Sequence, residues 1–287
     1  MKRVLITGAD SFVGTSVEKW LMKEPNEYHI ETLDMKNPNW RKFDFSMFDV
    51  VFHVAGIAHV STKKSMDNIY YSVNRDLAIE TAYKAKESGV KQFIFMSSSI
   101  IYGDNGSLMD KKPINKNTFN PQNAYGKSKL DADLTILNMN DKEFKCVIIR
   151  TPVIYGINCK GNIPKLLNIA KYAVFFPNIK NIKSMIYIDF LSDSVKHYID
   201  NKLSGVFFPQ NPEYISTKEI IKIAREFYGK KYRETKIFNL FIYLISPFST
   251  TIKKIFGNKF FELDEQYFSH ELSIKETLLR TMGRDSR

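Results

Sequence analysis

Cysteine is scarce in this 287-residue chain, and long apolar runs are absent. Cys146 lies in a stretch typical of a buried strand and Cys159 in a loop-like one, so neither a disulfide framework nor a metal cluster is indicated. No run is long enough to span a bilayer, and the apolar residues 4–8 are too few for a signal peptide. We therefore expect a cytoplasmic protein without a metal site.

Acidic residues are outnumbered, since 42 Lys and Arg stand against 31 Asp and Glu and give a formal net charge of +11. Such a surplus favours an anionic partner, which could be nucleic acid, anionic lipid or a phosphorylated substrate. The basic residues are spread among acidic ones, and neither zinc-finger spacing nor an aromatic RNA-binding pattern occurs. We therefore expect no nucleic-acid partner.

A strand, a glycine turn and a helix open the chain. Residues 4–7 form an apolar run typical of a buried strand, and an amphipathic helix follows residues 8–14. N–H groups at a helix N-terminus bind phosphate oxygens, and glycines let a phosphate approach the backbone closely. The turn therefore predicts a pyrophosphate site rather than a plain connection, and its members are Gly8, Ser11, Phe12, Val13 and Gly14.

Two carboxylates follow the second apolar strand, residues 30–33. Asp34 ends that strand, where it can accept hydrogen bonds from an adenosine ribose, and this favours NAD. Lys36 and Arg41 could instead receive a 2′-phosphate, so NADP stays open, and Asp34 could also be a solvated turn residue. Asp44 could reach the adenine amino group.

Further strands alternate with helices. Residues 49–56 form a strand that ends in Val54, Ala55 and Gly56, against which a cofactor backbone could lie. A helix is expected from near Asn74, followed by an apolar strand over 92–96 and a serine-rich turn. This alternation predicts an α/β fold with a doubly wound parallel sheet, helices on both faces and ligands at the carboxyl ends of the strands.

Tyr125 and Lys129 lie four residues apart in a predicted helix and therefore share one face. A positive neighbour favours the phenolate and lowers the Tyr pKa, which is otherwise about 10. Tyr125 could then exchange a proton with a substrate hydroxyl. Taken alone, the pair could also be a helix that happens to carry these two residues.

Together these motifs resemble the extended short-chain dehydrogenase/reductases, in their branch of NAD-dependent nucleotide-sugar epimerases, dehydratases and reductases. The resemblance runs from residue 1 to about residue 230, where each motif alone is loose but the ordered set is specific. The matching segments are 7–14 (TGxxGxxG), 51–56 (the strand end), 97–103 (SSxxxYG), 125–129 (YxxxK) and 150–156 (RxxxVYG). It implies a Rossmann-type sheet with a small C-terminal α/β substrate lobe.

The resemblance also implies catalytic roles. Tyr125 would be the acid/base, and Lys129 would lower its pKa and bind the nicotinamide ribose. Ser98 would hydrogen-bond the reacting oxygen, with Ser99 as the alternative. Asn74 would lie near the cofactor, although a helix cap explains it nearly as well.

Other positions match the family less closely. Pro152, in the RxxxVYG turn, is expected at the cofactor. Ser11 occupies the middle glycine position of the first loop, so a side chain is expected toward the pyrophosphate there. Ser99 and Ile100 stand where the family's dehydratases carry an acidic pair, so we do not expect a dehydratase.

The resemblance divides the chain into a dinucleotide-binding domain over 1–156 and, over 157–287, mainly a substrate-binding lobe with some return to the first domain. Asn162 would contact a diphosphate. Lys183 stands where the family's Arg binds substrate phosphate, and a point charge can hold phosphate without the bidentate geometry. A solvated strand end is the alternative for Lys183.

Residues 237–261 are apolar, aromatic and basic, yet too short to cross a bilayer. Packing on the lobe or on a dimer partner is the usual explanation for such a segment. Peripheral membrane contact is the alternative, because anionic lipid attracts basic residues that lie near it.

We therefore expect an NAD(P)-dependent oxidoreductase whose partner is a nucleotide-diphosphate sugar. The favoured activity is that of a UDP-sugar 4-epimerase that works through a 4-keto intermediate in polysaccharide or cell-surface glycan precursor synthesis, as a homodimer. One alternative is a 4-ketoreductase of a UDP- or dTDP-4-keto-6-deoxy sugar. Another, of a different class, is a non-catalytic NAD(P)-binding regulator.

Overall fold

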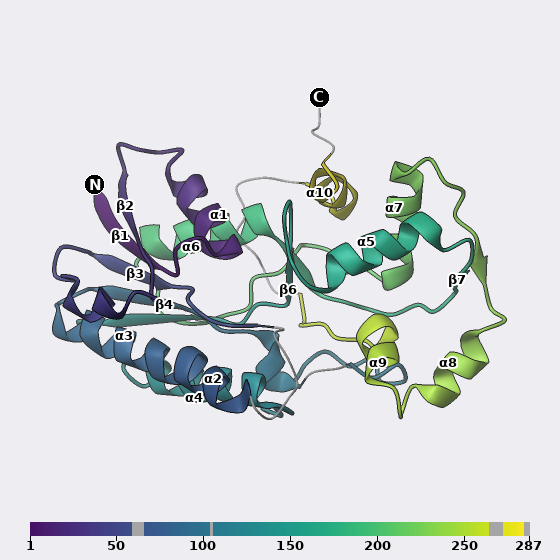
Figure 1. The fold of residues 1–287 in the computed structure, drawn as a ribbon, viewed down its shortest axis with the longest axis horizontal. Coiled ribbons are helices and arrows are strands. Elements are labelled where there is room, and N and C mark those ends of the chain that lie inside the picture. Colours follow the sequence, from purple (N-terminus) through teal and green to yellow (C-terminus); the bar gives the residue numbers. More distant parts are fainter. Residues whose placement is uncertain (59–65, 104–105, 264–271, 284–287) are drawn as a thin grey trace.

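The computed structural model describes residues 1–58, 66–103, 106–263 and 272–283 (Figure 1). Its centre is a parallel sheet of six strands in the order β2-β1-β3-β4-β5-β9, which confirms the predicted doubly wound α/β fold. The strands are β1 Lys2–Thr7, β2 Tyr28–Leu33, β3 Val50–His53, β4 Gln92–Met96, β5 Lys145–Ile149 and β9 Gly205–Phe207. Because all of them run parallel, their carboxyl ends meet at one edge of the sheet.

Helices cover both faces of this sheet (Figure 1). One face carries α1 (Phe12–Leu21) and α6 (Ile188–Asp200), which pack on each other. The other carries α2 (Asp67–Tyr70), α3 (Leu77–Glu87) and α4 (Ala124–Leu137). Short 3₁₀ turns, η1 (Pro38–Lys42) and η4 (Ser99–Tyr102), lie in the connections.

The helix expected near Asn74 begins earlier, at Asp67, and passes through a π-helical stretch, η3 (Tyr71–Asp76), before α3. The expectation about its start was therefore wrong. Asn74 is fully buried within this stretch, so its side chain does not cap a helix. Its amide instead bonds the backbone of Ile57 in the loop after β3, a contact 17 residues away that helix-start patterns do not encode.

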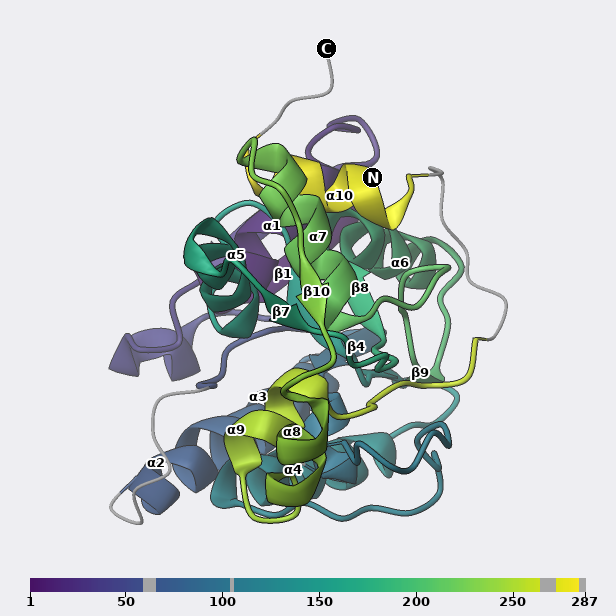
Figure 2. The same ribbon diagram turned by 90° about the vertical axis from the view of Figure 1, so that its right-hand side faces the viewer.

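The C-terminal lobe lies beside the carboxyl edge of the sheet (Figures 1 and 2). Two small parallel pairs, β6 with β8 and β7 with β10, are flanked by helices. The strands are β6 Val153–Tyr155, β7 Phe176–Pro177, β8 Met185–Tyr187 and β10 Glu234–Thr235. The helices are α5 Asn162–Tyr172, α7 Thr217–Phe227, α8 Asn239–Ile245, α9 Thr250–Phe256 and α10 Ile274–Thr281. In the described part of the chain, no helix has the length and apolar character needed to cross a membrane.

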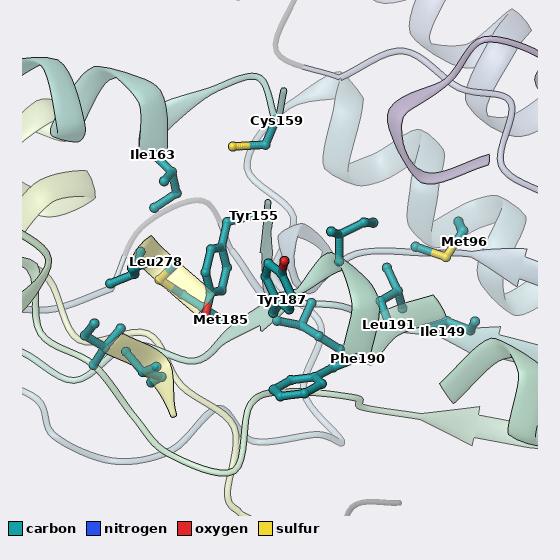
Figure 3. Packing of buried hydrophobic residues seen from close by; sticks show 14 of the residues in the cluster. Met96, Ile149, Tyr155, Cys159, Ile163, Met185, Tyr187, Phe190, Leu191 and Leu278 are labelled. Atoms are coloured by element: carbon teal, nitrogen blue, oxygen red, sulfur yellow. The ribbon is translucent and has the colours of Figure 1, made fainter. Parts of the chain in front are cut away.

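One apolar cluster runs from the sheet into the lobe, as Figure 3 shows from Met96 and Ile149 across to Leu278. At its centre the rings of Tyr155 and Tyr187 lie 5.6 Å apart. The Tyr155 hydroxyl, 2.6 Å from Thr277 Oγ1, ties α10 to this cluster. The position of the lobe relative to the sheet edge is therefore held by buried side chains.

Candidate active site

The glycine turn after β1 packs tightly against the end of β3. Gly8 has a φ of +108°, and a Cβ at this position would lie 2.7 Å from the Ala55 backbone nitrogen. Both features require glycine. The N–H groups of Gly8 and Ala9 donate to the Leu33 carbonyl oxygen at 2.9 and 3.3 Å, so the turn is fixed between the ends of β2 and β3.

Ser11 caps α1 rather than extending away from it. Its Oγ accepts the Gly14 N–H at 3.0 Å, and a Cβ on Gly14 would collide with that oxygen at 2.6 Å. Within the described residues, the N–H groups of Phe12 and Val13 find no protein acceptor. Two N–H groups at a helix N-terminus thus remain for an anion, beside the close-packed Gly8. These features fit the pyrophosphate of a dinucleotide.

Asp34 and Asp44 have different surroundings. Asp34 directly follows β2 at the carboxyl edge, is exposed, and accepts the Lys36 N–H at 3.0 Å. Arg41 pairs with Glu80 on α3. The Asp44 carboxylate accepts hydrogen bonds from the Ser46 hydroxyl and, at 2.9 Å, from the Ser46 N–H, and these bonds lower the Asp44 pKa.

A second cluster forms around the loop after β3. A Cβ on Gly56 would lie 3.0 Å from Asn74 Oδ1 and 3.4 Å from Lys129 Nζ. Asn74 holds the loop through two hydrogen bonds. The Ile57 N–H donates to Asn74 Oδ1 at 2.8 Å, and Asn74 Nδ2 donates to the Ile57 carbonyl oxygen at 3.0 Å. The end of β3 with Val54, Ala55 and Gly56 is thus joined to α4.

Tyr125 and Lys129 lie on the first turns of α4, as predicted. The helix is capped by Asn123, whose Oδ1 accepts the Gly126 N–H at 2.9 Å. The Tyr125 ring lies 5.7 Å from the Tyr70 ring and is half-buried. Lys129 is buried and donates from Nζ to the Met96 carbonyl oxygen at 2.8 Å, at the end of β4. Burial lowers the Lys129 pKa to about 8.

The serine turn after β4 packs on the same helix. Ser98 caps η4 by accepting the Ile100 N–H, and the Ser99 N–H donates to the Thr151 carbonyl oxygen at 2.7 Å. Pro152 follows Thr151 directly and is buried. A Cβ on Gly126 would lie 3.3 Å from the Ile100 carbonyl oxygen, so η4 and α4 are in close contact.

A buried ion pair beneath this helix was not predicted. Arg150 contacts the Asp133 carboxylate through Nη2 to Oδ1 at 2.7 Å and Nε to Oδ2 at 3.0 Å. Ser97 donates to the same carboxylate at 2.5 Å, and Arg150 Nη1 donates to the Tyr102 hydroxyl at 2.8 Å. Asp133 follows Lys129 by four residues, so helical spacing from the Tyr–Lys pair was a signal that could have found it.

His53, at the end of β3, was also missed. It is fully buried between the rings of Phe93 and Phe95, with Nδ1 2.8 Å from Thr7 Oγ1. Its Nε2 is buried and finds no hydrogen-bond partner in the described residues. Burial, with a smaller contribution from Lys129, lowers the His53 pKa to about 3. The ring is therefore neutral at physiological pH.

The substrate-lobe residues lie on separate elements. Asn162 is the exposed first residue of α5. Lys183 precedes β8, bridges to both Ile215 and Lys259, and donates from Nζ to the Lys254 carbonyl oxygen at 2.9 Å. The Lys183 side chain is half-buried, and burial and the neighbouring Lys259 lower its pKa to about 8. Within the described residues, no group of His, Cys, Asp or Glu could hold a metal ion.

Comparisons with known proteins agree with this arrangement. The chain is 28% identical over 247 residues to a UDP-glucose 4-epimerase of Vibrio cholerae, covering 77% of this chain and 74% of that protein. It is 29% identical over 219 residues to an N-acetyl-alpha-D-glucosaminyl-diphospho-ditrans,octacis-undecaprenol 4-epimerase of Escherichia coli O157:H7, covering 70% of this chain and 64% of that enzyme.

Solved structures share the fold. A UDP-glucuronic acid 4-epimerase from Bacillus cereus, in complex with NAD and a fluorinated UDP-sugar, superposes with a TM-score of 0.73 at 18% identity over 97% of each chain. A dTDP-4-dehydrorhamnose reductase from Bacillus anthracis, in complex with NADP, gives 0.71 at 20% identity over 98% of this chain and 99% of that one. The sequence profile of the NAD dependent epimerase/dehydratase family matches residues 4–173. Well over half of the chain therefore carries that family's pattern, and this protein belongs to the NAD-dependent epimerase/dehydratase family of enzymes.

Proposed function

We propose that this chain is a UDP-sugar 4-epimerase that acts through a 4-keto intermediate in polysaccharide or cell-surface glycan precursor synthesis. The observation that carries the proposal is the placement of Tyr125 and Lys129. Both lie on α4, and Lys129 Nζ reaches the carboxyl ends of β3 and β4 at Gly56 and the Met96 carbonyl oxygen. Both curated relatives described above are named as 4-epimerases.

The residues at the carboxyl edge fit NAD. The pyrophosphate would lie on the N–H groups of Phe12 and Val13 beside Gly8 and Gly14. The Asp34 carboxylate would accept hydrogen bonds from the ribose hydroxyls. The rest of the site would be lined by Val54, Ala55, Gly56, Asn74 and Pro152. Asp44 would reach the adenine amino group. When bound, NAD supplies a reversible hydride acceptor.

The protein's own groups would handle the proton. Tyr125 would take the proton of the sugar 4-hydroxyl while C4 gives up a hydride to the dinucleotide. After the keto sugar presents its other face, the hydride would return to C4 and the proton to the 4-oxygen. The step is redox-neutral over a complete turnover. Lys129 carries a positive charge below a pH of about 8 and, one turn after Tyr125 on α4, would favour the phenolate. Ser98, or Ser99 beside it, would hydrogen-bond the 4-oxygen.

The substrate would lie between the two parts of the chain. We propose the division at residues 1–156 and 157–287, with the nucleotide diphosphate held from the second part. Lys183 supplies a half-buried cation, and Asn162 lies at the N-terminus of α5. Both groups can bind a diphosphate, and an ammonium group that is partly withdrawn from water attracts anions more strongly than an exposed one.

Turnover of a panel of nucleotide sugars, followed by NMR with and without added NADPH and NADH, tests the proposal. A 4-epimerase converts its substrate to the epimer with no added reductant. Stoichiometric consumption of NAD(P)H with a 4-keto-6-deoxy sugar would instead show the 4-ketoreductase. Dinucleotide binding without turnover of any member would support a non-catalytic regulator and overturn both enzyme proposals.

Compartment and assembly are proposed as well. The two cysteines are buried and unpaired, which suits a reducing cytoplasm. We propose a homodimer as the assembly, and sedimentation velocity at several concentrations tests it. A single monomeric species at all concentrations would contradict that assembly.

A further inference from the structure

The helix α8 exposes large apolar side chains instead of burying them. The exposed fractions are 71% for Leu240, 62% for Phe241 and 65% for Leu244. Ile237 and Phe238 just before the helix and Phe248 just after it are exposed as well. We call these six residues the α8 face. Ile242 alone within the helix is buried, so α8 is attached to the lobe by a narrow contact.

The rest of the segment 237–261 behaves differently. Phe256, at the end of α9, and Phe260 and Phe261 beyond it are all buried. Phe256 packs with Phe176 at a centroid distance of 5.7 Å, and Phe261 packs with Phe208 at 5.1 Å. The prediction that residues 237–261 pack on the lobe is therefore confirmed for the second half of the segment. For the α8 face that prediction is wrong.

Exposed apolar residues continue from α8 onto the neighbouring strand pair. Asn239 Nδ2 donates to the Asn178 carbonyl oxygen at 2.8 Å, which joins the start of α8 to the end of β7. Val174 and Phe175, just before β7, are exposed, and so is Tyr172 at the end of α5. In Figures 1 and 2 this part of the lobe lies at the end of the molecule away from the central sheet. Exposed apolar residues thus occur on both α8 and the segment before β7, at one extremity of the molecule.

The chain segment that contains α8 is strongly basic. Between residues 229 and 261 the only acidic residue is Glu234, which is engaged by Lys218 at 3.1 Å. The basic residues of the same stretch are Lys230, Lys231, Arg233, Lys236, Lys253, Lys254 and Lys259. Arg233 lies 6.0 Å from the Phe175 ring, so basic and apolar groups are interleaved. An apolar surface fringed by cations is complementary to an anionic, amphipathic partner.

A second copy of the chain fits this surface poorly. A two-fold dimer places the same patch of both copies against each other, so Lys236 and its basic neighbours would meet a surface whose charges are also mainly basic. Like charges brought together in this way oppose association. A bilayer avoids this, because the apolar side chains can enter the acyl boundary while the basic residues stay with anionic headgroups.

From this charge complementarity and from the exposure of the α8 face we infer that the α8 face binds the surface of an anionic lipid bilayer. Phe238, Leu240, Phe241 and Leu244 enter the headgroup boundary, and Lys236 and Lys254 lie at the level of the phosphates. The inference does not depend on the proposed epimerase activity, because it uses none of the residues of the candidate active site.

Co-sedimentation of the full chain with vesicles tests the inference. Vesicles of phosphatidylcholine with about a third phosphatidylglycerol should pellet the protein at low salt, and pure phosphatidylcholine vesicles should pellet much less. Each basic residue near such a surface contributes about fivefold to binding, so Lys236→Glu/Lys254→Glu should weaken it about 25-fold or more. Leu240→Ser/Phe241→Ser should weaken binding to a similar extent and leave thermal unfolding unchanged, since both side chains are exposed.

Matched controls separate this surface from net charge and general hydrophobicity. Lys19→Glu/Lys142→Glu changes the charge equally at exposed sites on the sheet domain, and Tyr83→Ser removes an exposed aromatic residue from α3. Both controls should bind vesicles like the unchanged protein. The inference is overturned if the chain does not pellet with anionic vesicles at low salt. It is equally overturned if the controls weaken binding as much as the α8 variants, or if Leu240→Ser/Phe241→Ser turns a dimer into a monomer without affecting vesicle binding.

Discussion

Asp133 and Arg150 form a two-pronged ion pair, with N–O distances of 2.7 and 3.0 Å, in which the side chains are 0% and 5% exposed. Asp133 lies one turn after Lys129 on α4, and Arg150 directly follows β5. The pair therefore locks the helix that carries Tyr125 against the end of a neighbouring strand. It also places a carboxylate near Lys129, where the negative charge counteracts the effect of burial on the Lys129 pKa.

Asp133→Asn should lower both stability and the alkaline limit of activity. Removing one partner of a buried pair leaves a charge uncompensated and typically costs about 3–5 kcal/mol of unfolding free energy. The Lys129 pKa is about 8, and it should fall when the carboxylate is removed. The alkaline limb of the pH profile of kcat/KM should therefore move to lower pH by about one unit. Urea unfolding and a pH–rate profile measure the two effects. A stability loss with an unchanged profile would show that Asp133 is only structural.

Tyr125→Phe should abolish turnover while NAD binding is retained. The substitution removes the transferable proton but keeps the ring, which packs 5.7 Å from Tyr70. A general acid/base is typically worth about 10²- to 10⁴-fold in rate. Steady-state kinetics on the identified substrate and a fluorescence titration with NADH measure the two quantities. Tyr83→Phe, on an exposed site of α3, serves as the control, and near-normal turnover of the Tyr125 variant would refute the assignment.

Asp34 should make NADH the preferred dinucleotide. A 2′-phosphate would meet its carboxylate at close range, and the candidate cation Arg41 is paired with Glu80. Asp34→Ser should therefore tighten NADPH binding, whereas Glu31→Gln, which removes a charge three residues upstream, should not. Dissociation constants from fluorescence titration decide between the cofactors. Tighter NADPH binding by the unchanged protein would show that Lys36 dominates instead.

Lys183→Met should weaken binding of UDP by about 10- to 100-fold, the range expected for a lost hydrogen bond to a charged group. Because the Lys183 pKa is about 8, affinity of the unchanged protein should also fall as the pH rises through that value. In the variant this pH dependence should disappear. Calorimetric titration between pH 7 and 9 is the measurement, with the exposed Lys180→Met as control. Equal affinities at all pH values would remove Lys183 from the substrate site.

His53 should make the fold sensitive to acid. Its pKa is about 3 in the folded protein and about 6.5 in an unfolded chain, so between these values the unfolded state binds more protons. Stability should therefore fall by about 1.4 kcal/mol for each unit that the pH drops within this window. His53→Asn should lose this slope, and the exposed His29→Asn should keep it. Urea unfolding at pH 6.5 and 5 compares them, and parallel slopes in all three proteins would exclude His53 as the cause.

Local patterns were enough for the fold class and for several site elements. Alternating apolar runs and helix signals predicted the parallel sheet, because each depends on residues close together in sequence. The same holds for the turn at Gly8, whose positive φ only glycine adopts easily, and for the shared helix face of Tyr125 and Lys129. These features are determined by backbone geometry within a few residues.

Tertiary packing decided what those patterns left open. Asn74 bonds Ile57 instead of capping a helix, and Arg150 finds Asp133 across the core. Each outcome depends on which distant segments meet, and residue spacing carries no information about that. The α8 face shows the same limit, since periodicity identifies an apolar stripe but not whether anything covers it. Only the arrangement of the whole lobe leaves Leu240 and Phe241 in solvent while it buries Phe260 and Phe261.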